Sequence, residues 1–219
     1  MAIKVAVFDL DGTVLDTISS IAHFCNVAME KLGISSLPVE NYKYYVGNGA
    51  KNLVHRALNA QNADTEENFN KVFSEYMESY DSNPAYKTGH FDGLPEVLEK
   101  MREKGIVLGI VSNKPESTVL EVIPEFFPDG FFKYVYGSLS KMPLKPDPAA
   151  IFHIMKEENA NKDEVLYVGD SGVDMETGKN AGVLTVGVSW GFRSREELAE
   201  NGADAVIDTP SRLLDFLGM

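Results

Sequence analysis

The stretch VAVFDLDGT, Val5 to Thr13, begins with apolar residues and ends in two acids, a glycine and a threonine. Its first four residues predict a buried strand, so Asp9 and Asp11 follow directly on a strand end. Two carboxylates this close to a core cost free energy unless a cation or a chemical role compensates them. Gly12 lets the chain turn sharply, so Asp11 need not point where Asp9 points. The stretch therefore predicts a metal site, a reaction site, or both.

The composition excludes several classes of partner. The 219 residues carry a formal net charge of -13, and 44% of them are hydrophobic and 24% charged. These values are typical of a globular chain with one sizeable domain, or with a core domain and a modest insertion. The negative field repels polyanions and no Lys/Arg cluster offsets it, so we expect no nucleic acid and no membrane as partners. A small anionic substrate is compatible if local cations or a metal override the field.

Cysteine content and targeting signals agree with this view. Cys25 is the only cysteine, so no intramolecular disulfide can form, which fits a reducing compartment. Asp9 and Asp11 interrupt the first apolar run, which is therefore no signal peptide. No apolar run approaches the ~20 residues that span a bilayer. We expect a cytoplasmic protein.

Residues 16–81 are predicted to form an all-helical insertion. Apolar residues recur at helical spacing over 18–32 and 69–80. Two shorter helix-like runs, 38–45 and 50–58, are separated by a loop that contains two glycines. Nothing from about residue 19 to 80 predicts a strand.

From residue 93 onward, strands alternate with helices. The predicted strands cover 106–112, 133–137, 165–169, 183–189 and, more weakly, 204–208. The predicted helices cover 94–101, 116–123, 147–158, 174–181, 194–200 and a closing segment from Pro210. This alternation predicts an α/β fold, a doubly wound parallel-sheet (Rossmann-like) core with helices on both faces. The core is expected to comprise residues 1–15 and 82–219, with residues 16–81 inserted.

Three predicted strands end in chemically useful residues. The first ends at Asp9, the next at Ser112 and Asn113, and a third just before Asp170. Ligands of such sheets bind beyond the carboxyl ends of the strands, so we expect these residues to meet there. Two carboxylates, Asp9 and Asp170, and a carbonyl near Asp11 would give a hard divalent cation an oxygen cage, which suits Mg²⁺.

An anion at the same place would find partners of its own. Ser112 and the backbone N–H groups beside it can donate to phosphate oxygens, and Lys145 can neutralise anionic charge. An EF-hand calcium loop beginning at Asp9 is excluded, because its sixth and twelfth positions hold Val14 and Ser20 instead of Gly and Glu. The four histidines are scattered without metal-ligand spacing.

Four motifs together resemble those of the haloacid dehalogenase-like phosphatases. They are DLDGT (9–13), VSNK (111–114), LKPDP (144–148) and GDSGVD (169–174), in family order across nearly the whole chain. Each is weak alone, but the ordered set is specific. The helical block resembles the small cap domain of that family. Within it, VGNGA (46–50) resembles the phosphoglycolate phosphatase branch, and so does the tail of the chain, with WGFRSREEL (190–198) and GADAVID (202–208).

The resemblance implies roles for individual residues. Asp9 is implied to attack phosphorus and form an aspartyl-phosphate, while Asp11 protonates the leaving oxygen and then deprotonates the hydrolytic water. Mg²⁺ is implied to be held by the Asp9 carboxylate, the Asp11 carbonyl and Asp170, with Asp174 orienting a metal-bound water. The residues implied to bind the phosphoryl group are Ser112, Asn113 and Lys145.

Substrate choice is predicted to lie in the cap loop. Gly47, Asn48, Gly49 and Lys51 form this loop, whose two glycines allow close approach to a small substrate. Its N–H groups at the start of the next helix, helped by Lys51 or Arg56, suit the carboxylate of a compact substrate such as 2-phosphoglycolate.

We therefore expect a Mg²⁺-dependent phosphatase that acts on a small phosphorylated metabolite, with 2-phosphoglycolate as the favoured substrate and a monomer or homodimer as the assembly. Pyrophosphate, nucleoside monophosphates and sugar phosphates stay open as substrates, as does a phosphosugar mutase. A non-catalytic phosphate-binding module is a third reading. The second acid, Asp11, speaks against it, because pure binding does not require that residue.

Overall fold

Six parallel strands form the central sheet of the protein, which we describe from a computed structural model over residues 2–138 and 142–217. In spatial order the strands are β5 (Tyr134–Ser138), β4 (Val107–Pro115), β1 (Val5–Phe8), β6 (Val165–Gly169), β7 (Leu184–Val188) and β8 (Ala205–Ile207). Every neighbouring pair is parallel. The doubly wound α/β core predicted from the sequence is confirmed.

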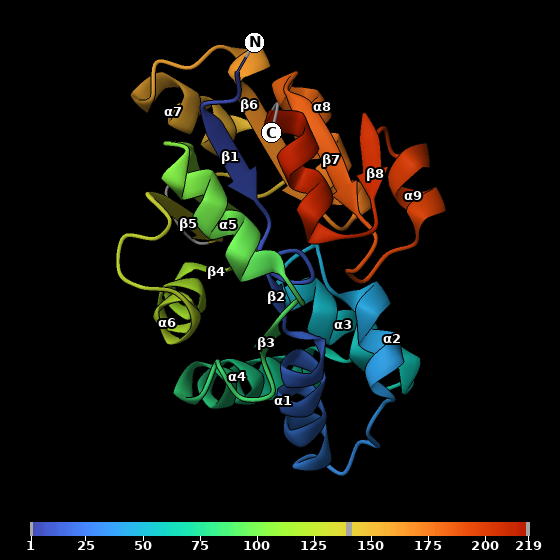
Figure 1. The fold of residues 1–219 in the computed structure, drawn as a ribbon. Helices are drawn as coiled ribbons and strands as arrows, with labels where there is room; N and C mark the ends of the chain where they lie inside the picture. The colour runs from blue at the N-terminus through green and yellow to red at the C-terminus, as the bar shows by residue number, and fades with distance from the viewer. Residues whose placement is uncertain (1, 139–141, 218–219) are drawn as a thin grey trace.

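Helices cover both faces of this sheet (Figure 1). Side chains alternate along β1: Ala6 and Phe8 belong to one apolar cluster, Val5 and Val7 to another. The first cluster is completed by α5 (Leu94–Glu103), α6 (Glu116–Phe126) and the 3₁₀ helix η2 (Pro210–Leu217). The second is completed by α7 (Ala149–Glu157) and α8 (Gly172–Ala181). Two short helices, η1 (Lys162–Glu164) and α9 (Arg195–Glu200), precede β6 and β8.

Four helices form a separate group beyond the carboxyl end of β1 (Figure 1). They are α1 (Ile18–Glu30), α2 (Val39–Tyr45), α3 (Ala50–Ala60) and α4 (Glu66–Ser82). They share their own apolar cluster, which Phe192 joins from the loop after β7. None of the described helices is long and apolar enough to cross a lipid bilayer.

Two features differ from the sequence-based expectation. The connections into and out of the helical group pair as two-residue antiparallel strands, β2 (Leu15–Asp16) and β3 (Gly89–His90). A two-residue strand has no periodicity, so no pattern announced it. β4 also runs three residues past its predicted end, with a register shift between Val111 and Pro115. This extension carries the chain from the sheet toward the helical group.

Candidate active site

The register of the sheet places the candidate catalytic residues together at the edge formed by the carboxyl ends of the strands. Phe8 of β1 is paired with Ile110 of β4 on one side and with Val168 of β6 on the other. The backbone N–H of Asp9 donates to the carbonyl of Val168 at 2.9 Å, so β1 keeps its place in the sheet up to this residue. Asp170 follows the end of β6 in the same way. The ends of these strands therefore lie side by side, as predicted from the sequence.

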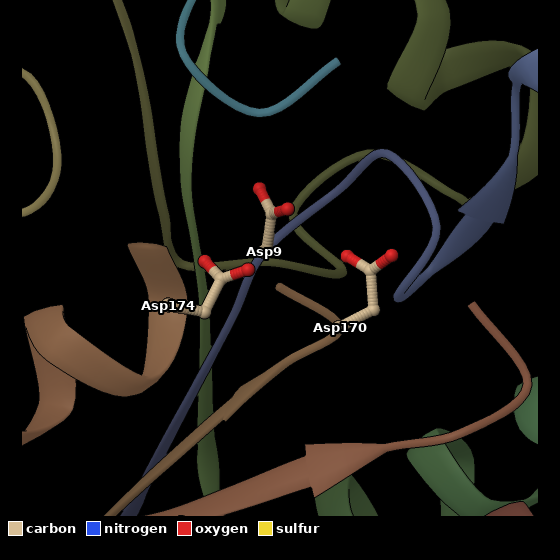
Figure 2. A group of neighbouring side chains, drawn as sticks. All are labelled: Asp9, Asp170 and Asp174. Atoms are coloured by element: carbon tan, nitrogen blue, oxygen red, sulfur yellow. The ribbon is translucent and has the colours of Figure 1, made fainter. Parts of the chain in front are cut away.

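Three carboxylates converge at this edge. One oxygen from each of Asp9, Asp170 and Asp174 lies within 4.8 Å of the others, and all three side chains are buried. Figure 2 shows that they come from the end of β1, the end of β6 and the first turn of α8. Such a group of oxygen ligands is what Mg²⁺ prefers in proteins.

One ammonium group sits among these acids. Lys145 Nζ is 2.7 Å from Asp9 Oδ1 and 2.7 Å from Asp174 Oδ1. The pKa of Asp9 is raised to about 7: burial raises it most, Lys145 opposes that effect, and Asp174 and Asp11 add smaller increases. Burial likewise raises the pKa of Asp170 well above its usual range, with Asp174 and Asp9 adding to the effect. A single lysine thus leaves negative charge uncompensated, and a bound divalent cation would compensate it.

Asp174 is already saturated by protein donors. Its Oδ2 accepts from the Ser171 backbone N–H at 3.1 Å and from the Ser171 hydroxyl at 2.5 Å. Its Oδ1 accepts from Tyr167 Oη at 3.1 Å and from Lys145 Nζ at 2.7 Å. A carboxylate has about four lone-pair sites, so these four donors fill Asp174. Asp174 thus holds Lys145 and the start of α8, and the metal-bound water that the resemblance assigns to it stays a prediction.

Asp170 keeps acceptor sites free for a cation. Oδ2 accepts from the Phe192 backbone N–H at 2.7 Å and Oδ1 from the Thr13 hydroxyl at 3.3 Å, which orients the carboxylate by one donor on each oxygen. Two of its four sites are thus used in the described part of the chain. Asp9 and Asp170 are therefore the side chains best able to ligate a metal ion.

Two glycines make room for Asp170. Gly12 has φ +88°, and a Cβ added there would lie 2.4 Å from Asp170 Oδ2. A Cβ on Gly191 would lie 2.3 Å from the Cβ of Asp170. Neither position tolerates a side chain while Asp170 keeps its orientation.

Asp11 is not part of the three-carboxylate group and pairs with a different cation. Lys114 Nζ lies 3.1 Å from Asp11 Oδ1 and donates to Tyr80 Oη of α4 at 2.6 Å. The Lys114 side chain is only 3% exposed, yet its pKa is raised: burial opposes its charge, but Asp11 and Tyr80 outweigh that effect. No role was predicted from the sequence for Lys114 or Tyr80. Lys114 stands in the quoted VSNK motif, whereas nothing in the aromatic pattern of α4 singled out Tyr80.

The two residues at the end of β4 have different surroundings. Asn113 Nδ2 donates to the carbonyls of Gly47 and Lys145, at 3.0 and 3.2 Å, and its Oδ1 accepts from the Lys145 N–H at 2.9 Å. Its side chain thus ties the loop before α3 to the segment that carries Lys145. The Ser112 hydroxyl accepts from the Lys114 N–H at 3.2 Å, which leaves its own hydrogen for a ligand.

A cavity lies between the sheet edge and the helical group. It leaves about 40 Å³ for the centres of water-sized molecules. Its lining residues are Asp9, Asp11, Ile21, Val46, Gly47, Gly49, Ala50, Leu53, Tyr76, Ser112, Asn113, Lys114, Pro115 and Lys145. One water needs roughly 10–15 Å³ by this measure, so the cavity suits a compact ligand.

Two of the four predicted cap-loop residues line the cavity and two do not. Gly47 and Gly49 line the cavity, but Asn48 and Lys51 do not, and Lys51 is exposed. Arg56 donates to the carbonyl of Tyr45 at 2.9 Å and to Asn48 Oδ1 at 2.8 Å, so it braces the loop. Neither Lys51 nor Arg56 therefore lines the cavity as a partner for a bound anion.

One further sequence match to a catalytic motif takes no part in this site. Residues 187–191, GVSWG, match the G-x-S-x-G spacing of a nucleophile elbow. No helix follows the strand directly, and the Ser189 hydroxyl lies 2.6 Å from Asp208 Oδ1 and 3.3 Å from the carbonyl of Ile207. The serine serves the packing of β7 on β8.

Comparison with known proteins agrees with the geometry. The family model of haloacid dehalogenase-like hydrolases matches residues 6–188. A phosphoglycolate phosphatase of Vibrio parahaemolyticus is 30% identical, over 99% of this chain and 97% of its own. One from Pseudomonas syringae pv. tomato is 32% identical, over 96% of this chain and 78% of its own. The crystal structure of a protein from Lactobacillus delbrueckii subsp. bulgaricus superimposes with a TM-score of 0.93 at 32% identity, covering 100% of both chains.

Proposed function

Since this chain belongs to the haloacid dehalogenase-like hydrolase family and is a phosphatase, we propose that it hydrolyses a small phosphomonoester, 2-phosphoglycolate, by phosphoryl transfer to Asp9. One observation carries the proposal: a buried carboxylate, Asp9, faces a compact cavity, is held by Lys145, and has a second, separate carboxylate beside it in Asp11. A two-step hydrolysis needs a nucleophile and a separate proton carrier. Here Asp9 pairs with Lys145 and Asp11 with Lys114.

Mg²⁺ is the proposed cofactor. The carboxylates of Asp9 and Asp170 and the Asp11 carbonyl would hold it, because Asp174 has no acceptor site to spare. The bound ion would neutralise the charge of the carboxylates and of the transferring phosphoryl group.

The proposed reaction has two steps, each with balanced atoms. In the first, an Asp9 oxygen forms a bond to phosphorus, the ester P–O bond breaks, and Asp11 gives its proton to the leaving oxygen. In the second, Asp11 takes a proton from water, the water oxygen bonds to phosphorus, and the acyl-phosphate bond breaks to release phosphate and restore Asp9. Lys145 holds Asp9 in place, while Ser112 and the backbone beside it donate to the phosphoryl oxygens.

Residues 16–81 are proposed to act as the cap over this site. The helical group has its own apolar core and lines one side of the cavity through Ile21, Val46, Leu53 and Tyr76. The small size of the cavity supports a substrate such as 2-phosphoglycolate over a nucleoside monophosphate. We further propose that the protein works in the cytoplasm as a monomer or homodimer, where its lone buried thiol, Cys25, stays reduced.

Phosphate release across a panel of small phosphomonoesters, with and without metal, tests the proposal. We expect 2-phosphoglycolate to be hydrolysed with Mg²⁺, EDTA to abolish the activity, and added Mg²⁺ to restore it. Ca²⁺ is expected to inhibit, because its larger and more flexible shell can take both oxygens of Asp9 and spoil the line of attack. Full activity in Ca²⁺ alone would contradict this ligand scheme, and no phosphate release from any panel member would contradict the function.

Replacement of Gly49 tests the role of the cap loop. Gly49 lines the cavity with φ +87° and ψ 160°, a conformation that is strained for any other residue. In Gly49→Val we expect the KM for 2-phosphoglycolate to rise about tenfold or more, while hydrolysis of a small aryl phosphate barely changes. Gly33→Val is the matched control, because Gly33 also has positive φ (+72°) and an added Cβ there meets nothing within 4 Å. An equal loss for both substrates in Gly49→Val would refute the assignment.

A further inference from the structure

Two buried lysines of the cavity each pair with a different carboxylate. In the described residues that line it, Lys145 and Lys114 are the only basic side chains. Lys145 pairs with Asp9, the proposed nucleophile, and Lys114 pairs with Asp11, the proposed proton carrier. Each lysine side chain is 3% exposed, so both ammonium groups act in an environment where a charge interaction is much stronger than in water.

Lys114 lies where the leaving group of the substrate is expected to bind. Asp11 must reach the ester oxygen that leaves, so whatever that oxygen carries lies near Asp11. Lys114 Nζ is 3.1 Å from Asp11 Oδ1, which places it beside the alcohol part of the substrate rather than the phosphoryl group. A substituent one or two bonds from the ester oxygen is then within reach of this ammonium.

Lys114 also has a hydrogen to spare. An ammonium donates three hydrogen bonds, and the described residues supply two acceptors, the Asp11 carboxylate and Tyr80 Oη. The cavity wall nearby is apolar, with Ile21, Leu53 and Tyr76 each almost fully buried. An anionic substituent in such a wall is costly unless a cation meets it.

We infer that Lys114 binds a carboxylate, or an anion of the same size, on the leaving group, and so selects substrates that carry a second anionic group close to the phosphate ester. The inference rests on the proposed phosphatase function. It makes Lys114, rather than the cap-loop cations Lys51 and Arg56, the source of selectivity. Tyr80 of α4 is a positioning residue for Lys114, since its hydroxyl holds the ammonium from the helical group.

The other nearby cations do not supply this interaction. Lys51 is exposed and outside the cavity, and Arg56 is engaged with the loop before α3. Arg193 donates to the carbonyl of Val46 at 2.9 Å and pairs with Glu197, and it does not line the cavity either.

The test compares two substrates that differ in one charge. The ratio of kcat/KM for 2-phosphoglycolate to that for ethyl phosphate, which lacks the carboxylate, is measured in the wild type, Lys114→Gln and Lys114→Arg. We expect the wild type to prefer 2-phosphoglycolate, Lys114→Gln to lose about 10- to 100-fold of that preference, and Lys114→Arg to keep most of it. Any common loss through Asp11 cancels in the ratio. Lys71→Met, on the exposed face of α4, is the control and should leave both rates unchanged.

Each outcome decides between separate claims. An unchanged ratio in a folded Lys114→Gln overturns the inference, and so does a wild type that hydrolyses both esters without preference, while the phosphatase function stands in either case. The wild-type comparison needs no variant, so a poorly folding Lys114→Gln does not remove the test. A wild type that hydrolyses neither ester nor any other phosphomonoester overturns the proposed function and the inference with it.

Discussion

Replacing Asp9 with asparagine is expected to abolish turnover, with a loss on the order of 10⁴-fold or more, while the fold stays intact. The amide has nearly the shape of the carboxylate, but it neither attacks phosphorus nor ligates Mg²⁺ as a carboxylate does. Near-wild-type rates in this variant would refute Asp9 as the nucleophile.

The stability of the same variant gives an independent check. The pKa of Asp9 is raised to about 7, chiefly by burial and against the opposing charge of Lys145, so ionising this carboxyl costs free energy in the folded, metal-free protein at neutral pH. Asparagine removes that cost, and Lys145 keeps Asp174 as a partner. We therefore expect the Tm without metal to be equal to or above that of the wild type. Asp129→Asn, at an exposed position, is the control for both measurements.

Replacing Asp11 with asparagine is expected to show a loss that depends on the leaving group. For alkyl phosphates, which need protonation of the leaving oxygen, we expect kcat to fall about 10²- to 10⁴-fold. Aryl phosphates leave without that proton, so their phosphoryl transfer to Asp9 should be much less affected. Equal losses in the first step for alkyl and aryl phosphates, measured by rapid quench, would contradict the role of Asp11 as an acid.

The Tm of this variant is expected to fall below that of the wild type, unlike the Tm of Asp9→Asn. Asp11 is the anionic partner of Lys114, whose side chain is 3% exposed, and asparagine leaves that ammonium without a counter-charge. We expect a lower Tm, in part because Tyr80 alone cannot neutralise the charge. Calorimetry on the two variants side by side checks this contrast.

The order of the elements could be predicted from the sequence because the relevant signals are local. Continuous apolar runs predicted β1 and β6, and the acids behind them predicted where the site would lie, since parallel strands end at one edge. The 3.6-residue periodicity of α1 and α4 identified the helical group. Two-residue strands such as β2 carry no such signal, and the extension of β4 depends on contacts with β5 rather than on its own pattern.

The contacts of the site were only partly predictable. The meeting of Asp9 with Asp170 follows from strand register, and the structure brings them together. The pairing of Lys114 with Tyr80 joins residues 34 positions apart on different elements, and no local pattern encodes it. Lys51 was a reasonable candidate by charge and position, but it is exposed on α3 and does not line the cavity.

The most direct test of the account is to look for a phosphoryl group on Asp9. The Asp11→Asn protein is mixed with an aryl phosphate and Mg²⁺, quenched in acid, digested and examined by mass spectrometry. The account predicts that the peptide containing residues 5–13 gains one phosphoryl group, located on Asp9, because the first step proceeds while hydrolysis lacks its base. Phosphate release without any phosphorylated peptide, or a phosphoryl group on another residue, would contradict it.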